Sequence, residues 1–194
     1  MSEPVREILV DCPAWVGEVV DWGRSYAGDE DRMALAIRLA AENVDRGSGG
    51  PFGAAIFERS GRLVSVGVNS VVRLANCTLH AEMVAFMLAQ RRVGSFTLAA
   101  PGLDDHELFT SCEPCAMCLG ATLWSGVVRV VYAAGGADAR DLGFDEGPVF
   151  AESHAYLRER GIALEGGLLR ENARSVLARY RELSGPVYNR RPEV

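Results

Sequence analysis

The chain has 194 residues, of which 48% are hydrophobic, and this is enough for one domain with a substantial core. Its net charge is −6 and its basic residues are scattered, so no phosphate-tracking stripe is visible and a polynucleotide partner is disfavoured. The chain contains no lysine, which excludes Schiff-base chemistry, and no apolar run of about 18 residues, which argues against a membrane span.

The N-terminal residues are acidic and lack the basic start and apolar stretch of a secretory signal peptide. The five cysteines are an odd number and show no disulfide spacing. We therefore expect a cytoplasmic protein that does not contact a membrane.

The first half of the chain predicts a helix followed by a hairpin. Residues 29–46 carry apolar side chains at the three-and-four spacing of an amphipathic helix, which stops at Gly47. After a glycine-rich loop, residues 52–57 and 63–69 are predicted as two strands joined across Ser60-Gly61.

The middle of the chain predicts alternating helices and strands. Thr78 can cap a helix that ends near residue 92. Residues 108–112 are predicted as a short strand, followed by a helix over 114–125 and an apolar, buried strand over 127–134. The order strand, helix, strand implies a parallel pair.

The last part of the chain predicts a loop over 135–148, a helix over 149–160, a strand over 162–165 and a helix over 170–183. Together these elements predict an α/β domain with three layers, α/β/α. The right-handed crossover rule then packs the helices that begin near residues 80 and 115 side by side under one face of the sheet.

Two motifs at the starts of these helices carry the chemistry. His80-Ala81-Glu82 and Pro114-Cys115-Ala116-Met117-Cys118 supply one imidazole, two thiolates and one carboxylate. His80, Cys115 and Cys118 give zinc three protein ligands and leave the fourth position for water, as in a catalytic site. Pro114 suits the first position of a helix, whose positive end favours thiolates, and Glu82 stays free to shuttle protons. This combination is the signature of zinc deaminases.

Two alternatives use the same residues. A zinc-stapled interaction module without catalysis needs a fourth ligand, for which Cys112, Cys77 or His106 are the candidates. A redox dithiol would use only the cysteine pair and leave the histidine and the glutamate unexplained. His106 and His154 have no ligand spacing to the motif and are expected to be surface or core histidines.

The order of these elements and motifs resembles the cytidine deaminase superfamily over residues 29–183, in the branch with guanine, cytosine and tRNA-adenosine deaminases. Within that branch the chain looks most similar to bacterial guanine deaminases of the guanine/ammeline type. The similarity rests on five stretches: Pro51-Phe52-Gly53-Ala54, Asn69, Thr78-Leu79-His80-Ala81-Glu82, Glu113-Pro114-Cys115-Ala116-Met117-Cys118 and Gly143-Phe144-Asp145-Glu146-Gly147-Pro148.

The resemblance implies a cytidine deaminase-like fold with a central five-stranded mixed sheet whose last two strands run parallel. It also implies one zinc ion per chain and a homodimer with active sites near the interface. In similar guanine deaminases a second acid assists proton transfer to the leaving amine. Glu146 corresponds to that acid, with Asp145 as the fallback, and Glu82 is the first catalytic carboxylate.

The resemblance further implies that the substrate is held by Asn69, Phe52, Ala81 and Tyr188. Two of them have a plainer interpretation, because Asn69 can occupy a turn and Phe52, like Trp124, can pack in a core. The C-terminal tail, residues 184–194, is a candidate lid over the pocket. Residues 1–28 form an N-terminal extension that could cap the pocket or a dimer surface.

These observations predict a zinc-dependent aminohydrolase that converts a purine-type base, guanine, to xanthine and ammonia. The alternatives are other amino-heterocycles: ammeline or another aminotriazine, cytosine, a nucleoside such as guanosine, or a pterin. A tRNA adenosine deaminase ranks third, because the chain is acidic and has no basic stripe.

Overall fold

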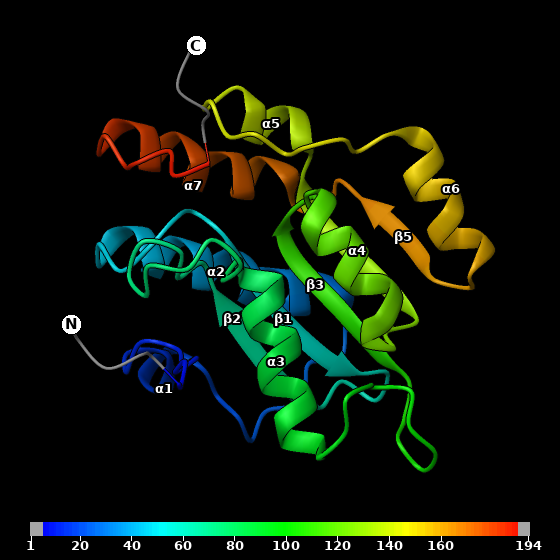
Figure 1. Cartoon of the computed structure of the whole chain (residues 1–194). Coiled ribbons are helices and arrows are strands. Elements are labelled where there is room, and N and C mark those ends of the chain that lie inside the picture. The colour runs from blue at the N-terminus through cyan, green and yellow to red at the C-terminus, as the bar shows by residue number, and fades with distance from the viewer. Residues whose placement is uncertain (1–5, 190–194) are drawn as a thin grey trace.

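The computed structural model describes residues 6–189, and a five-stranded mixed sheet lies at its centre (Figure 1). The strands run in the spatial order β2-β1-β3-β4-β5. β1 pairs antiparallel with β2 and β3, whereas β3, β4 and β5 are parallel to one another. The predicted mixed sheet with two parallel last strands is therefore confirmed. The strands are β1 (Gly53–Glu58), β2 (Leu63–Val68), β3 (His106–Cys112), β4 (Arg129–Ala134) and β5 (Ala163–Gly166).

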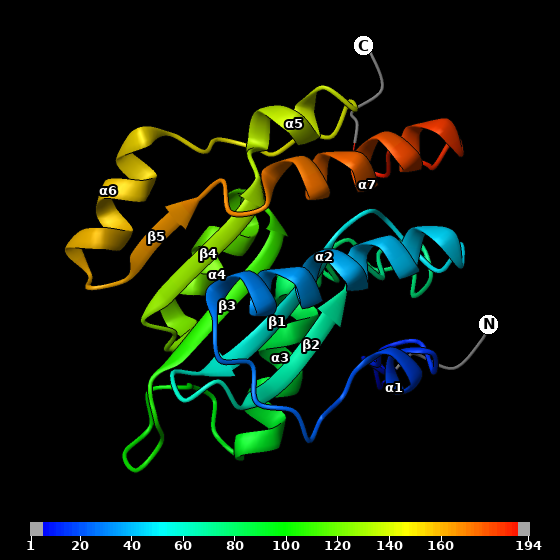
Figure 2. The same cartoon turned by 180° about the vertical axis from the view of Figure 1, so that it is seen from behind.

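Helices cover both faces of the sheet, which confirms the three-layer prediction. α2 (Asp29–Asp45) and α7 (Arg170–Glu182) lie on one face, seen in front in Figure 2. α3 (Ala81–Val93), α4 (Ala116–Ser125) and α6 (Ala151–Glu159) lie on the other face (Figure 1). Among the described residues, no helix combines the length and the apolar character that a bilayer crossing requires.

The alternation of the strands divides the core into two clusters. Along β1, Ala54 and Ile56 face α3, while Ala55 and Phe57 face α2, and all four are fully buried. Gly67 in β2 brings the start of α3 against the sheet, because a Cβ there would lie 2.0 Å from the carbonyl oxygen of Ala81. This close approach fixes the position of the first turn of α3, which carries the predicted site.

The N-terminal segment packs on its own domain. Ser25 forms a bridge with Arg62, and the Tyr26 N–H donates to the Gly61 carbonyl at 3.0 Å, at the turn between β1 and β2. The short helix α1 (Val16–Val19) buries its apolar side chains, with that of Trp15, in the core cluster on the α2 face. Residues 6–28 thus form a strap along the hairpin.

Three details of the predicted elements are wrong. His80, and not Thr78, is the N-cap of α3, because the Thr78 hydroxyl donates to the Asn76 side chain at 2.7 Å within a turn. α4 begins at Ala116 with Cys115 as its N-cap, two residues after the predicted start. The predicted loop over 135–148 contains the helix α5 (Gly136–Arg140), which Asp138 stabilises by accepting a hydrogen bond from the Gly135 N–H at 2.8 Å.

Candidate active site

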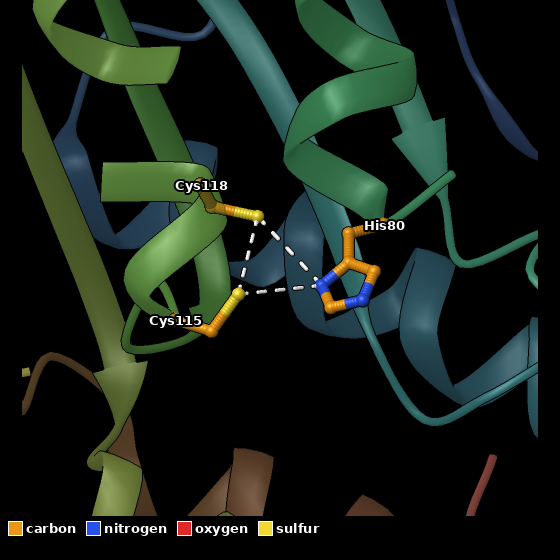
Figure 3. Close-up of side chains that lie close together, drawn as sticks. All are labelled: His80, Cys115 and Cys118. Carbon is orange, nitrogen blue, oxygen red and sulfur yellow. Dashed lines mark hydrogen bonds between the residues drawn. The ribbon is translucent and has the colours of Figure 1, made fainter. Parts of the chain in front are cut away.

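His80, Cys115 and Cys118 converge where α3 and α4 begin (Figure 3). His80 Nδ1 lies 3.5 Å from Cys115 Sγ and 3.7 Å from Cys118 Sγ, and the two sulfurs are 3.7 Å apart. Two N-cap positions and the first turn of α4 therefore supply the three side chains. The predicted meeting of the two helix starts is found in the structure.

The triangle of these three atoms has the dimensions of a zinc site. Zinc bonds of about 2.3 Å to sulfur and 2.0–2.1 Å to nitrogen, at tetrahedral angles, separate two sulfurs by about 3.8 Å and sulfur from nitrogen by about 3.6 Å. The observed separations match these values. Within residues 6–189 no other His, Cys, Asp or Glu completes this group as a fourth ligand. Three ligands leave a position open for water, as a catalytic site requires.

The candidates for a fourth ligand lie elsewhere. Cys77 is exposed, and His106 is fully buried with its Nδ1 3.1 Å from the Leu98 carbonyl oxygen. Cys112 is buried beside the site but does not join the ligand triangle. These positions argue against a closed structural zinc site.

The environment of Cys115 favours the deprotonated form that binds metals, whereas the hydrogen bond with Cys115 and burial raise the pKa of Cys118. The hydrogen bond between the two sulfurs, together with the neighbouring His80, lowers the pKa of the Cys115 thiol to about 4. Cys115 is also the N-cap of α4, where the helix dipole stabilises negative charge. The site thus holds a thiolate at neutral pH.

Two carboxylates are buried beside this triangle. Glu82 is 6% exposed in the first turn of α3, and Glu146 is 8% exposed in the loop that follows α5. Burial, strengthened by the negative Cys115, raises the pKa of both, that of Glu146 to about 8. Neither carboxylate is in an ion pair among the described residues, and Glu146, with its pKa near 8, can exchange a proton near neutral pH.

The conformation of the loop that carries Asp145 and Glu146 directs only one of these two acids toward the site. The Ala116 N–H donates to the Glu146 carbonyl oxygen at 3.0 Å, which ties this loop to the start of α4. Asp145 is exposed, and its carboxylate accepts a hydrogen bond from the Gly147 N–H at 2.9 Å. Glu146 lines the cavity and Asp145 does not.

The predicted substrate-binding residues surround the same cavity, with one exception. Asn69 is fully buried, and its Nδ2 donates to the Tyr188 hydroxyl at 2.6 Å. Phe52 packs edge-on against Phe144 with the ring centroids 5.1 Å apart. Ala81 is buried against Gly67 and does not line the cavity. The cavity is lined by Phe52, Asn69, His80, Glu82, Cys112, Glu113, Cys115, Glu146, Tyr188 and Asn189.

Tyr188 almost fills the cavity. The remaining space is about 20 Å³, which is room for about one water molecule. The Tyr188 ring lies edge-on to His80, with centroids 6.0 Å apart, and against Phe144 at 5.2 Å. Trp124 neither packs in the core nor lines the cavity, and it is 76% exposed on α4.

Sequence reasoning did not assign several residues that line or support the site. Glu113 accepts a hydrogen bond from the Gly136 N–H at 2.6 Å and lies 3.0 Å from His154 Nε2. Phe144 joins Phe52 and Tyr188 in an aromatic cluster. Both residues stand in stretches that carried the family resemblance, and this was the available signal. Cys112 was a candidate only for a fourth zinc ligand, and nothing in the sequence predicts that it lines the cavity, because a buried cysteine is usually a small apolar residue.

Comparison with known proteins agrees with this geometry. The model of the cytidine and deoxycytidylate deaminase zinc-binding region matches residues 27–134. The chain belongs to this family, and its cofactor is zinc. It is a hydrolytic deaminase.

Several relatives are similar over most of their length. Guanine deaminase of Bacillus subtilis is 42% identical over 133 residues, which are 69% of this chain and 81% of that protein. The structure of guanine deaminase from Nitrosomonas europaea superposes with a TM-score of 0.87 at 38% identity, covering 93% of this chain and 100% of the other. A variant of the protein NE0047 in complex with 8-azaguanine superposes with a TM-score of 0.86 at 40% identity, covering 91% and 98%.

Proposed function

We propose that this protein hydrolyses guanine to xanthine and ammonia, with His80, Cys115 and Cys118 as the zinc ligands. The observation that carries the proposal is the pair of buried carboxylates, Glu82 and Glu146, beside an open three-ligand metal site. The similar proteins named guanine deaminase support guanine as the substrate. Zinc held by the three ligands would activate the water that attacks the amino-bearing ring carbon.

The two carboxylates divide the proton transfers. Glu82 accepts a proton from the attacking water and passes it to the adjacent ring nitrogen. Glu146 delivers a proton to the amino group, which then leaves as ammonia. Their burial without a paired arginine supports these roles, because a carboxylate fixed by an arginine stays ionised and cannot donate a proton.

Asn69 and Phe52 bind the base in this scheme. The Asn69 amide offers both a donor and an acceptor, which suits the edge of a purine, and Phe52 offers an aromatic face. Crystal structures of NE0047 with 8-azaguanine include variants of one asparagine and of one glutamate. Those two positions are separated by the same number of residues in that sequence as Asn69 and Glu146 are in this one. Ala81 stays a prediction as a substrate contact.

The C-terminal tail acts as a lid in this proposal. Tyr188 holds the Asn69 amide and fills the space beside His80, so a purine base, which is larger than one water, enters only when Tyr188 moves. Asn189 fixes the closed tail, because its Nδ2 donates to the Asp145 carbonyl oxygen at 2.7 Å. The tail was predicted over 184–194, and residues 190–194 lie outside the described part of the chain.

The proposal places this enzyme in the cytoplasm as a homodimer. The described cysteines are all free thiols, in keeping with a reducing compartment. Trp124 is 76% exposed on α4, and a neighbouring groove between α4 and α6 is lined in part by Leu119 and Leu123. Such a surface suits a second copy. Light scattering coupled to size exclusion tests the dimer, and a monomer at micromolar concentration contradicts it.

Ammonia release tests the activity. Zinc-loaded wild type and Glu82→Gln are incubated with guanine, guanosine, cytosine, cytidine, adenine, adenosine, ammeline and a pterin. We expect the wild type to release ammonia fastest from guanine and the variant to release almost none. Faster release from another member of the panel contradicts guanine as the substrate, and equal release by the variant contradicts the role of Glu82.

A further inference from the structure

The main chain of Asn69 is held from behind by a second asparagine. Asn43 Nδ2 donates to the Asn69 carbonyl oxygen at 3.0 Å and to the Gly50 carbonyl oxygen at 2.8 Å. Both asparagine side chains are fully buried. The position of the Asn69 amide in the cavity therefore depends on the orientation of the Asn43 amide.

That orientation is set by a chain of hydrogen bonds that begins in the N-terminal segment. Trp15 Nε1–H donates to Ser48 Oγ at 3.0 Å, and the Ser48 hydroxyl donates to Asn43 Oδ1 at 2.8 Å. The indole N–H can only donate, so Ser48 Oγ accepts from Trp15 and its own O–H donates to Asn43 Oδ1. This directs Asn43 Nδ2 toward Asn69. The Trp15 side chain is 7% exposed, so water does not readily replace its N–H.

The loop between α2 and β1 has no room to shift without moving Asn69. A Cβ at Gly49 would lie 2.0 Å from the Asn69 carbonyl oxygen and 2.6 Å from Asn43 Nδ2. A Cβ at Gly50 would lie 3.1 Å from Asn69 Oδ1 and 3.0 Å from a ring carbon of Tyr188. Displacement of Ser48 is therefore transmitted to the asparagine that faces the cavity.

A second contact ties the same segment to the residue after Asn69. Arg73 Nη1 donates to Asp11 Oδ1 at 2.8 Å, and Arg73 Nη2 donates to Ser70 Oγ at 3.1 Å. Asp11 is 46% exposed, so this ion pair contributes less than the buried chain from Trp15. The N-terminal segment is thus connected to the Asn69 loop in two ways, directly through Asp11 and indirectly through Trp15.

We propose that Trp15, acting through Ser48 and Asn43, positions Asn69 for binding of the base. The inference rests on the proposed function, because Asn69 is assigned to the base there. Trp15 touches neither the substrate nor the metal ligands, so it is a positioning residue. The N-terminal segment is then part of the apparatus that sets substrate affinity.

The test compares two tryptophans of this segment. Trp15→Phe keeps an aromatic ring under Arg46, whose guanidinium carbon lies 5.4 Å from the Trp15 ring centroid, and removes only the N–H donor. Trp22→Phe is the matched control, because Trp22 is 43% exposed and stacks on Arg92, away from Asn69. Loss of one hydrogen bond that orients a binding group predicts a five- to tenfold decrease in kcat/KM for guanine, roughly. We expect this decrease to come mainly from a higher KM, with kcat and zinc content nearly unchanged.

A double-mutant cycle separates positioning from general destabilisation. In the Asn69→Ala background, Trp15→Phe should have no further effect on kcat/KM, because the group that it positions is gone. Ser48→Ala should reproduce the Trp15→Phe defect, and the two together should not add. An equal loss with Trp22→Phe, or the same loss by Trp15→Phe in the Asn69→Ala background, overturns the inference.

A second measurement does not depend on the substrate. Hydrogen exchange followed by mass spectrometry should show faster exchange over residues 69–76 in Trp15→Phe than in Trp22→Phe. Equal exchange in the two variants overturns the inference. If the wild type releases no ammonia from guanine, the proposed function fails, and the exchange experiment still decides whether Trp15 orders the Asn69 loop.

Discussion

Carboxylates are buried at both ends of the central sheet, but only those at one end are paired with arginines. At the end that carries the metal ligands, Glu82 and Glu146 are buried without a cation, and their pKa values are raised. At the other end, Glu107 is buried against Arg32 at 2.7 Å, and Arg129 binds both Asp29 and Glu165. Hydrogen bonds from Arg129 lower the pKa of the Asp29 and Glu165 carboxyls.

The difference shows that the partner of a carboxylate, and not the carboxylate itself, decides its role. An arginine keeps the carboxylate ionised and joins strands and helices, which serves stability. A buried carboxylate without an arginine costs stability but can take up and release a proton, which serves catalysis.

The largest effect is expected at Glu82. Glu82→Gln removes the proton carrier and keeps the size of the side chain, so turnover should fall by about a thousandfold or more. Bound zinc should stay at one ion per chain, measured by plasma mass spectrometry. Glu159→Gln, on the exposed side of α6, is the control and should keep full activity. Loss of zinc from Glu82→Gln would show that Glu82 supports the metal site and would contradict its assignment.

The next largest effect is expected at the opposite end. Arg32→Met removes the 2.7 Å partner of buried Glu107, leaves only Arg129 at 3.6 Å and Arg59 at 3.8 Å, and should lower the free energy of unfolding by about 3 kcal/mol. Arg24→Met breaks the exposed pair with Asp31 and should cost less than about 1 kcal/mol. Denaturant unfolding measures both. kcat of Arg32→Met should stay near the wild-type value well below its melting temperature, and a large loss of kcat would mean that the two ends are coupled.

A smaller effect on turnover is expected at Glu146. Glu146→Gln should lower kcat about a hundredfold, because general acid catalysis is lost while attack on the ring still proceeds. Asp145→Asn is the matched control. Its exposed side chain can still accept the Gly147 N–H, so kcat should change by less than about twofold. A larger defect in Asp145→Asn than in Glu146→Gln would mean that Asp145, and not Glu146, is the second proton carrier.

The smallest effect is expected from acid pH at the Arg129 cluster. The folded-state pKa values of Asp29 and Glu165 lie below their unfolded values, so their contribution is present above about pH 4 and is lost as the pH falls through the folded values. Because both groups are partly exposed, the contribution is at most about 1 kcal/mol. The difference in free energy of unfolding between wild type and Arg129→Gln should be largest near pH 7 and should decrease as the pH falls below about 4. A constant difference contradicts this account.

Much of the fold could be predicted because its elements carry local signals. The helix over 29–45, the hairpin and the α4–β4 unit follow from the spacing of apolar residues and from glycines at their ends. The errors arose where a side chain has a partner that the local pattern does not indicate, either another residue of the same turn or a residue of a distant helix. Thr78 looked like a cap but bonds Asn76, and α5 is stabilised by Asp138, whose carboxylate also pairs with Arg170 from a distant helix.

The sequence by itself determined the chemistry, because a histidine, a glutamate and a Cys-x-x-Cys pair at helix starts define the ligands and the first proton carrier through residue type and spacing alone. Only the tertiary structure decided how these groups are surrounded. It buried Glu146 instead of Asp145, placed Tyr188 on Asn69 and tied Trp15 to the loop behind that asparagine. The physical reason is that burial and hydrogen-bond partners come from segments far apart in the chain, and no local pattern encodes which of them meet.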